Sequence, residues 1–358
     1  MRVLAFTRYD ADAASTRYRL LQFLPALHAA GIEVEWHPLL GHGHMKRLVD
    51  GQGAAKASLP KSYARRVAQL LADRKPDLLW VYGELLPLVP ASIELALMPR
   101  AVPVIYDWDD AFHLAYETHR KPLVRQLLSD KFGRLLKRAS AVTCGNAYLR
   151  DHVGQWCDNV LVVPTVVDTD RWVPAAAPPE EPPVIGWIGS PSTWANVRPL
   201  LPLLERLHRE TGVRLRAIGA GAGAEPDSFP GLDLVEWSEA TEIAEVQRFS
   251  IGIMPLVDQA FERGKSGFKL IQYMACGLPI MASPIGVNAT IVRDEANGLL
   301  ASTEAEWEAG LRRLIADAGL RTRFGQAGRV DATQRYSLAS QAPRLVSLFR
   351  SVAGASAR

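Results

Sequence analysis

The sequence predicts an α/β fold in which two Rossmann-like, doubly wound domains face a central cleft. Short apolar segments rich in β-branched residues alternate with longer helical patterns, this alternation occurs twice, and a proline-rich stretch separates the two halves. Continuous apolar strands that alternate with helices indicate parallel sheets covered on both faces. Such folds bind ligands at the carboxyl ends of their strands, so the cleft is the expected binding site.

The first half, residues 1–170, opens with a strand, a helix and a strand. These three elements are expected at residues 3–6, 15–30 and 32–36. Four more strands are expected in this half, at residues 78–82, 102–106, 141–143 and 160–163.

A linker at residues 171–183 follows, because its many prolines suit neither a helix nor a strand. A second alternation of strands and helices fills residues 184–338. Its strands are expected at residues 184–188, 214–218, 232–235, 251–255 and 279–282. Its helices are expected near residues 198–211, 241–249, 268–276 and 304–317.

The composition is that of an ordinary globular protein, since 48% of the 358 residues are apolar and 22% are charged. A net charge of +3 is too small to suggest a nucleic-acid binder. Cys144, Cys157 and Cys276 share no metal-ligand spacing, which argues against zinc and predicts reduced, buried thiols. With neither a membrane-spanning apolar run nor a signal peptide, we expect a cytoplasmic protein.

The positive excess lies in the first half, and much of it falls between Lys121 and Arg138, where basic residues are interleaved with leucines. That pattern is typical of an amphipathic basic helix lying on an anionic membrane surface. It predicts peripheral contact with the inner face of the membrane. The alternative is an ordinary solvated helix face packed on a sheet.

The most informative segment spans residues 264–286. We expect a helix that starts near Gly267 and ends at Gly277, with a strand immediately after it. Lys265 and Lys269 lie near the helix start, where the dipole and the backbone N–H groups favour a diphosphate. Gln272, one turn beyond Lys269, offers a donor and an acceptor to a ribose diol.

A second group of candidates follows the first strand. We expect the next helix to be capped by Ser15 or Thr16, with Arg17 and Arg19 just inside its first turn. Cations there oppose the helix dipole, which favours a contact with an anionic acceptor or a diphosphate. Thr16, Arg17 and Arg19 are therefore the acceptor-binding candidates.

Three carboxylates, those of Asp107, Asp109 and Asp110, follow the strand expected at residues 102–106, at the sheet edge that faces the cleft. The alternative is that they cap a helix and solvate a loop. The Asp107-Trp-Asp109 run also matches a three-residue metal motif, but a match of that length is weak. In the second half, Trp237 follows a strand and can stack on a nucleobase or simply pack.

Residues 264–286 resemble the donor-site helix of the retaining GT-B glycosyltransferases of family 4, also called glycosyl transferases group 1. Other segments are similar to motifs of that family, at residues 163–168, 186–193, 285–288 and 297–300. The resemblance implies a GT-B fold and retaining transfer of a sugar from a UDP- or GDP-type nucleotide diphosphate sugar to an acceptor hydroxyl. It further implies a glycan or lipid-linked acceptor, from bacterial surface polysaccharide, lipopolysaccharide or glycolipid assembly, and a last helix, residues 339–358, that crosses back to the first domain.

Family members carry a His or Asp close to the position of Asp107, so Asp107 and Asp110 are the candidates for orienting donor and acceptor hydroxyls. The family also places the loop after the first strand of the second domain at the diphosphate. The donor-binding candidates are Gly189, Ser190, Thr193, Trp237, Lys265, Lys269, Gln272 and Gly286.

The sequence departs from the family at two places that concern the chemistry. The usual pair of glutamates eight residues apart is replaced by Gly264 and Gln272, with Glu262 two residues early. The usual Arg and Lys of the 189–193 loop are absent, so Lys265 and Lys269 become the main cations for the diphosphate. We expect neither a cofactor nor a metal ion to be required. A nucleotide-sugar epimerase of GT-B shape and a catalytically silent sugar-nucleotide-binding subunit are the alternative functions.

Overall fold

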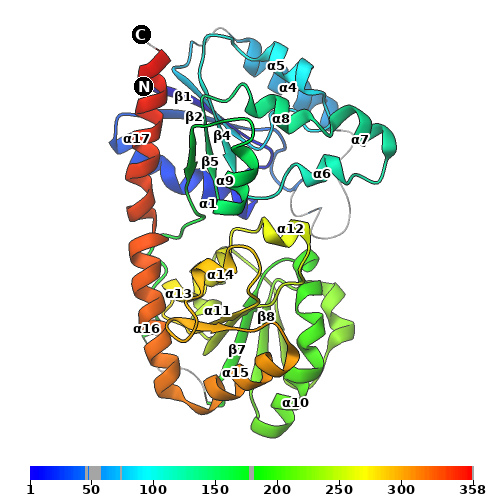
Figure 1. Ribbon diagram of the computed structural model, residues 1–358, viewed down its shortest axis with the longest axis vertical. Coiled ribbons are helices and arrows are strands. Elements are labelled where there is room, and N and C mark those ends of the chain that lie inside the picture. The colour runs from blue at the N-terminus through cyan, green and yellow to red at the C-terminus, as the bar shows by residue number, and fades with distance from the viewer. Residues whose placement is uncertain (45–46, 48–57, 73–74, 177–180, 357–358) are drawn as a thin grey trace. The chain divides into compact units, whose positions relative to one another are not determined.

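Two parallel six-stranded sheets organise the protein in the computed structural model (Figure 1). The structure describes residues 1–44, 47, 58–72, 75–176 and 181–356, so residues 177–180 of the expected linker lie outside it. Contacts divide the chain into two units. The first unit is Met1–Thr165, Gly264–Ser266 and Gln341–Arg358, and the second unit is Val166–Arg263 and Gly267–Ser340.

The sheet of the first unit has the strand order β2-β1-β3-β4-β5-β6, with every neighbouring pair parallel. Its strands are β1 (Arg2–Thr7), β2 (Glu33–Pro38), β3 (Leu78–Tyr82), β4 (Val104–Trp108), β5 (Ala141–Cys144) and β6 (Val160–Val162). Its helices are α1 (Ala14–Arg19), α2 (Leu24–Ala29), α4 (Leu59–Leu71), α5 (Ala91–Leu97), α6 (Leu114–Glu117), α7 (Pro122–Leu128), α8 (Lys131–Leu136) and α9 (Ala147–Val153).

The long helix α17 (Leu338–Ser356) contributes most of its residues to this first unit. The ring of Phe349 on α17 packs edge-to-face on Trp80 of β3, with centroids 5.1 Å apart, and both side chains are buried. Arg350 Nη2 donates a hydrogen bond to the carbonyl oxygen of Ala30, 2.7 Å away. The end of α17 is therefore part of the core of the first unit.

The sheet of the second unit has the order β12-β11-β10-β7-β8-β9, again entirely parallel. Its strands are β7 (Val184–Ile188), β8 (Arg214–Ile218), β9 (Leu232–Val235), β10 (Ile251–Met254), β11 (Ile280–Ala282) and β12 (Gly298–Leu300). Its helices are α10 (Leu201–Thr211), α11 (Glu242–Val246), α12 (Ala260–Arg263), α13 (Phe268–Ala275), α14 (Asn288–Ile291), α15 (Glu304–Ala316) and α16 (Ala318–Arg335).

Helix α13 packs against this sheet at a glycine. A Cβ atom on Gly252 of β10 would lie 2.3 Å from the ring of Tyr273 on α13, so only glycine permits this approach. The Tyr273 hydroxyl accepts a hydrogen bond from the N–H of Ile188, at the end of β7, and also reaches the carbonyl oxygen of Ile253. One side chain thus fixes α13 to two neighbouring strands.

The predicted fold class is confirmed, but three local expectations for the first half were wrong. The helix expected at residues 15–30 is broken into α1, a short 3-10 turn and α2, which has a proline at its start. The strand expected at 102–106 is β4, two residues later, so Asp107 lies within the strand. The single basic helix expected between Lys121 and Arg138 is two helices, α7 and α8. The three cysteines are free and buried, as predicted.

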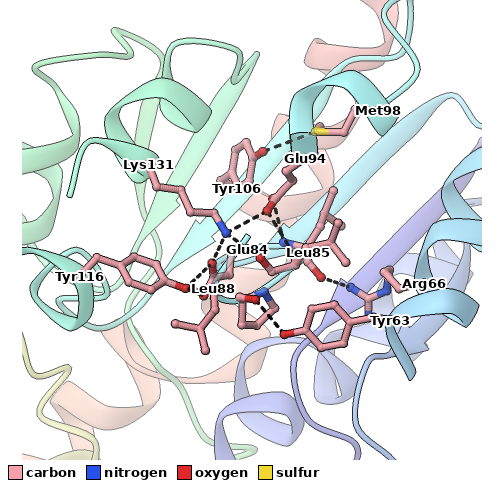
Figure 2. A network of polar contacts seen from close by, with 12 residues as sticks. Tyr63, Arg66, Glu84, Leu85, Leu88, Glu94, Met98, Tyr106, Tyr116 and Lys131 are labelled. Carbon is pink, nitrogen blue, oxygen red and sulfur yellow. Dashed lines mark hydrogen bonds and ion pairs between the residues drawn. The ribbon is translucent and has the colours of Figure 1, made fainter. Parts of the chain in front are cut away.

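One basic residue between Lys121 and Arg138 lies in the core of the first unit. Its burial explains part of the difference between the expected amphipathic surface helix and the structure. The side chain of Lys131 is fully buried, and its Nζ lies 2.5 Å from Glu84 Oε2 and 3.1 Å from Glu94 Oε2 (Figure 2). Burial raises the pKa of Glu94, while Lys131 opposes that rise. Lys131 therefore neutralises buried acids instead of adding charge to the surface.

The same network holds the loop that follows β3. Glu94 accepts a hydrogen bond from the N–H of Leu85 (Figure 2). It accepts another from the N–H of Leu86, and Lys131 donates to the carbonyl oxygen of Leu86. The Tyr116 hydroxyl accepts from the N–H of Leu88, a non-glycine residue with a φ of 61°. Side chains thus satisfy successive backbone groups of the loop at the carboxyl end of β3.

We predict that Lys131→Met lowers the free energy of unfolding by about 3–5 kcal/mol, because it leaves Glu84 and Glu94 buried without their cation. Lys137→Met, at an exposed position of the same stretch, serves as the control and should change stability by less than about 0.5 kcal/mol. Chemical denaturation of both variants measures the difference. Equal stability of the two variants would show that the buried network contributes little.

Candidate functional site

The candidate donor site of the second unit is built around the N-terminus of α13. Gly267 precedes the helix with a φ of 67°, and a Cβ there would lie 2.3 Å from Ile291 Cδ1. Glycine is therefore required both for the backbone conformation and for the lack of space. Because the N-cap residue is a glycine, it supplies no side-chain cap to the helix. Gly277 follows α13 with a φ of 70°, in agreement with the predicted end of the helix.

Lys269 lies in the first turn of α13, and its Nζ is 5.5 Å from the ring centroid of Trp187 on β7. The same tryptophan ring lies under the loop that follows β7: a Cβ on Gly189 would be 2.4 Å from it. In that loop, Ser190 N–H donates to Thr193 Oγ1, 3.2 Å away. Trp187 therefore connects Lys269 to the loop at residues 189–193.

Trp237 lies at the same edge of the sheet. Gly219, which follows β8, is so close to Gly189 that a Cβ on it would lie 2.4 Å from the Gly189 carbonyl oxygen and 3.1 Å from Trp237 Cβ. The indole N–H of Trp237 donates to Glu242 Oε2 at 3.1 Å, and the side chain is partly exposed. The carboxyl ends of β7, β8 and β9 thus bring together two of the positions named from the sequence, Gly189 and Trp237.

The remaining donor candidates have more limited access. Gln272 is 3% exposed, one turn below Lys269. Gly286 has a φ of 56° and lies against the backbone of Arg263. Lys265 belongs to the first unit, where Asn146 Nδ2 donates to the carbonyl oxygens of Gly264 and Lys265, 3.0 Å from each.

Asn288 is a residue that the sequence motif included but that was not named as a site residue. It is fully buried on α14, and its Nδ2 donates to the carbonyl oxygen of Ser283. Its Oδ1 has no hydrogen-bond partner among the described residues and would lie 3.7 Å from a Cβ on Gly267. An unsatisfied acceptor therefore lies beside the start of α13, and no sequence pattern indicates its orientation.

In the first unit, Asp107 and Arg19 form a buried pair. Asp107 on β4 is 2% exposed, and Arg19 donates to both of its oxygens, with Nε at 2.9 Å and Nη2 at 2.5 Å. Thr143 on β5 also donates to Asp107, and Arg19 Nη1 donates to the carbonyl oxygen of Val163. Burial alone would lower the pKa of Arg19, but Asp107 raises it above its ordinary value.

The expected helix cap after the first strand was wrong. Helix α1 begins at Ala14 without a side-chain cap, and Thr16 instead donates to the carbonyl oxygen of Tyr9. Because α1 is short, Arg17 and Arg19 lie in its last turn, where cations complement the dipole. Arg17 donates to carbonyl oxygens of the preceding loop. The helix dipole therefore gives no reason to expect an anion at Arg17 and Arg19. Acceptor binding by these residues stays a prediction.

The other two carboxylates after β4 differ from Asp107. Asp110 accepts a hydrogen bond from the N–H of Ala111, and Asp109 Oδ1 accepts one from the Tyr82 hydroxyl at 2.6 Å. Burial raises the pKa of Asp109 to about 7, against the opposing effect of Arg19. Sequence reasoning considered Asp109 only for a metal motif.

Metal-ligand spacing and exposed apolar side chains bear on possible ligands and on membrane contact. Within the described part of the chain, one three-residue group has metal-ligand spacing, Asp10, Asp12 and His42, and it does not include the aspartates after β4. No described helix is both long and apolar enough to cross a membrane. On α7, Leu123 and Leu127 are 64% and 55% exposed.

The two parallel Rossmann-type sheets give the protein a fold of the GT-B class. The protein resembles the sucrose-phosphate synthase of Thermosynechococcus elongatus over 99% of both chains, with a TM-score of 0.74 and 14% identity. It resembles Anabaena HepE in complex with UDP-glucose over 98% of this chain and 100% of that one, with a TM-score of 0.72 and 14% identity. At 14% identity these similarities show a shared fold alone.

Sequence comparison links the second half of the chain to a family. Residues 182–317 match the model of the family described as glycosyl transferases group 1. The D-inositol 3-phosphate glycosyltransferases of Xylanimonas cellulosilytica and Stackebrandtia nassauensis are 24% and 26% identical, over 54% of this chain and 51% and 48% of theirs. The chain thus spans about half the length of the curated relatives it matches. Residues 182–317 thus match the group 1 glycosyltransferases, the family that the sequence motifs predicted.

Proposed function

We propose that the protein transfers a glycosyl group from a UDP- or GDP-type nucleotide diphosphate sugar to an acceptor hydroxyl, with retention at the anomeric carbon. The first turn of α13 carries this proposal, because the dipole at a helix N-terminus favours an anion and Lys269 of that turn lies beside the loop at residues 189–193. The relatives support it: the curated ones are named glycosyltransferases, and HepE structures hold UDP or UDP-glucose.

In this proposal the charge that develops on the departing diphosphate is stabilised by fixed groups of the second unit. Lys269 supplies a full positive charge, and the α13 N-terminus supplies the dipole. Ser190 and Thr193 contribute loop donors, Trp237 stacks on the base, and Gln272 binds the ribose. No metal ion is required, because the cation and the dipole replace it.

The acceptor side of the proposal belongs to the first unit. Asp107 positions neighbouring groups through its pair with Arg19, and Asp110 orients hydroxyls. The family supports a glycan or lipid-linked acceptor from bacterial surface polysaccharide, lipopolysaccharide or glycolipid assembly.

We expect nucleoside diphosphate release only when both a nucleotide sugar and an acceptor are present, and we expect release to persist in EDTA. Coupled detection of the released nucleoside diphosphate measures this. Conversion of the nucleotide sugar without any acceptor would indicate an epimerase, and nucleotide-sugar binding without release would indicate a silent subunit. Loss in EDTA with rescue by Mn²⁺ would overturn metal independence and assign Asp107 and Asp109 as ligands.

Lys269→Ala should weaken nucleoside diphosphate binding about 10- to 100-fold, because a charge-assisted hydrogen bond to phosphate contributes roughly 1.5–3 kcal/mol. The melting temperature without ligand should barely change. Arg209→Ala, at an exposed position of α10, is the control and should bind normally. Calorimetric titration and thermal unfolding measure both quantities. Unchanged affinity with a lower melting temperature would make Lys269 a structural residue.

We further propose that α7 contacts an anionic bilayer at the inner face of the membrane. Leu123 and Leu127 are four residues apart, hence on one face of the helix, and both are exposed. Lys121 precedes them and Arg125 lies between them, which adds positive charge to the same helix. Apolar side chains flanked by cations match the chemistry of an anionic lipid surface.

Glutamate at both positions, Leu123→Glu with Leu127→Glu, should reduce co-sedimentation with vesicles containing phosphatidylglycerol by at least about tenfold, because apolar burial and charge attraction are both lost. Leu71→Glu is the control, since this α4 residue is also 64% exposed but lies outside the basic stretch. Wild-type binding should weaken at high salt. Equal binding by the double variant and the control would contradict the proposed surface.

A further inference from the structure

Leu88, in the loop between β3 and α5, has two features that are unusual for a leucine. Its backbone has a φ of 61°, in the left-handed region that bulky side chains rarely adopt. Its side chain is 62% exposed, so burial of that side chain does not compensate for the backbone strain. Strain of this kind persists only where the surrounding structure enforces it, and it is concentrated at sites that bind ligands. Leu88 is therefore a candidate ligand contact.

Buried side chains enforce the conformation of Leu88. The Tyr116 hydroxyl accepts a hydrogen bond from the N–H of Leu88 at 2.8 Å (Figure 2). The Tyr63 hydroxyl donates to the carbonyl oxygen of the preceding residue, Pro87, also at 2.8 Å. Tyr116 is itself fixed, because its hydroxyl also donates to the buried Glu84. The leucine is thus held in place although most of its side chain is exposed to solvent.

The loop that carries Leu88 lies next to the residues that follow β1. Because β1 and β3 are neighbouring parallel strands, the segments after them share one carboxyl edge of the sheet, where such folds bind ligands. The buried Arg66 joins the two segments, since its guanidinium donates to the carbonyl oxygen of Thr7 on one side and of Leu85 on the other. Arg8, directly after β1, is therefore a neighbour of the loop.

The positive charge of Arg8 reaches the side chains that hold Leu88. Burial raises the pKa of both Tyr63 and Tyr116, and Arg8 opposes this rise in each of them. The Arg8 side chain is exposed, its guanidinium lies 5.2 Å from the centroid of the Tyr9 ring, and no described carboxylate forms an ion pair with it. A fixed apolar side chain and an exposed cation thus lie at the same edge of the sheet.

We propose that Leu88 and Arg8 bind the acceptor, and that this acceptor is an anionic lipid whose hydrocarbon chain is joined through phosphate to the group that carries the acceptor hydroxyl. The inference rests on the proposed function and narrows its acceptor to one chemical class. Leu88 contacts the hydrocarbon chain, and Arg8 pairs with the phosphate. Because Leu88 is held rigidly before the lipid arrives, little conformational entropy is lost on binding, which accounts for the strained backbone.

The test measures the binding of octyl phosphate, kept below the concentration at which it forms micelles, by calorimetric titration. The wild type should bind it at least about tenfold more tightly than 1-octanol or inorganic phosphate, because each of these offers only one of the two contacts. Leu88→Asn should weaken binding about 5- to 30-fold through the lost apolar contact. Arg8→Gln should weaken it about tenfold through the lost charge.

Two exposed residues of the first unit give matched controls. Leu71→Asn replaces a leucine of α4 that is 64% exposed, and Arg100→Gln replaces an exposed arginine, so both variants should bind octyl phosphate as the wild type does. Asparagine tolerates the left-handed region, so Leu88→Asn should keep or raise the melting temperature, whereas loss of a structural residue would lower it. Affinity for UDP should be the same in all five proteins.

The inference is overturned if the wild type binds octyl phosphate no better than 1-octanol or inorganic phosphate, or if Leu88→Asn and Arg8→Gln bind it as the controls do. It is also overturned if Leu88→Asn binds octyl phosphate normally but loses co-sedimentation with vesicles containing phosphatidylglycerol, because Leu88 would then contact a bilayer and not the acceptor. A wild type that releases no nucleoside diphosphate with any acceptor would instead reject the proposed function itself, whatever the titrations show.

Discussion

The buried pair of Arg19 and Asp107 organises the reactive edge of the first unit. It joins α1, β4 and, through Thr143 and the Val163 carbonyl, β5 and the exit of β6. Two charges held this far from water are stable only together, since removal of either leaves the other unpaired in a low-dielectric site. Burial has the largest effect on the pKa of the neighbouring Asp109 and raises it, and the pair acts in both directions: Arg19 favours ionisation of Asp109, and Asp107 disfavours it. The same pair therefore holds these elements together and influences the ionisation of Asp109.

The sequence predicts those features that depend on local pattern. The glycines that flank α13 indicated both ends of the helix, and the paired alternation of strands and helices indicated two parallel sheets. The pairing of Arg19 with Asp107 was beyond such reasoning, because the two residues are 88 positions apart and their contact depends on how α1 packs on the sheet. The orientation of Asn288 and the bond from Tyr82 to Asp109 are tertiary features of the same kind.

The charge pattern also shows that local sequence predicts an element but not its tertiary contacts. The interleaved lysines and leucines before residue 138 suggested one amphipathic helix, but hydropathy along the sequence cannot distinguish a solvated lysine from a buried one. Lys131 is buried because Glu84 and Glu94 arrive from other elements to neutralise it. One cation of the stretch is thus buried in the core of the first unit. Within residues 121–138, all of which the structure describes, the exposed leucines lie on α7.

The contact between Phe349 and Trp80 has a consequence for biosynthesis. A domain at the start of a chain ordinarily folds while the ribosome is still making the rest. Here the first unit draws part of its core from α17, and Arg350 reaches a carbonyl group 320 residues earlier in the chain. The nascent first unit must therefore keep the apolar surface around Trp80 uncovered, or shielded by a chaperone, until translation of the second unit is complete.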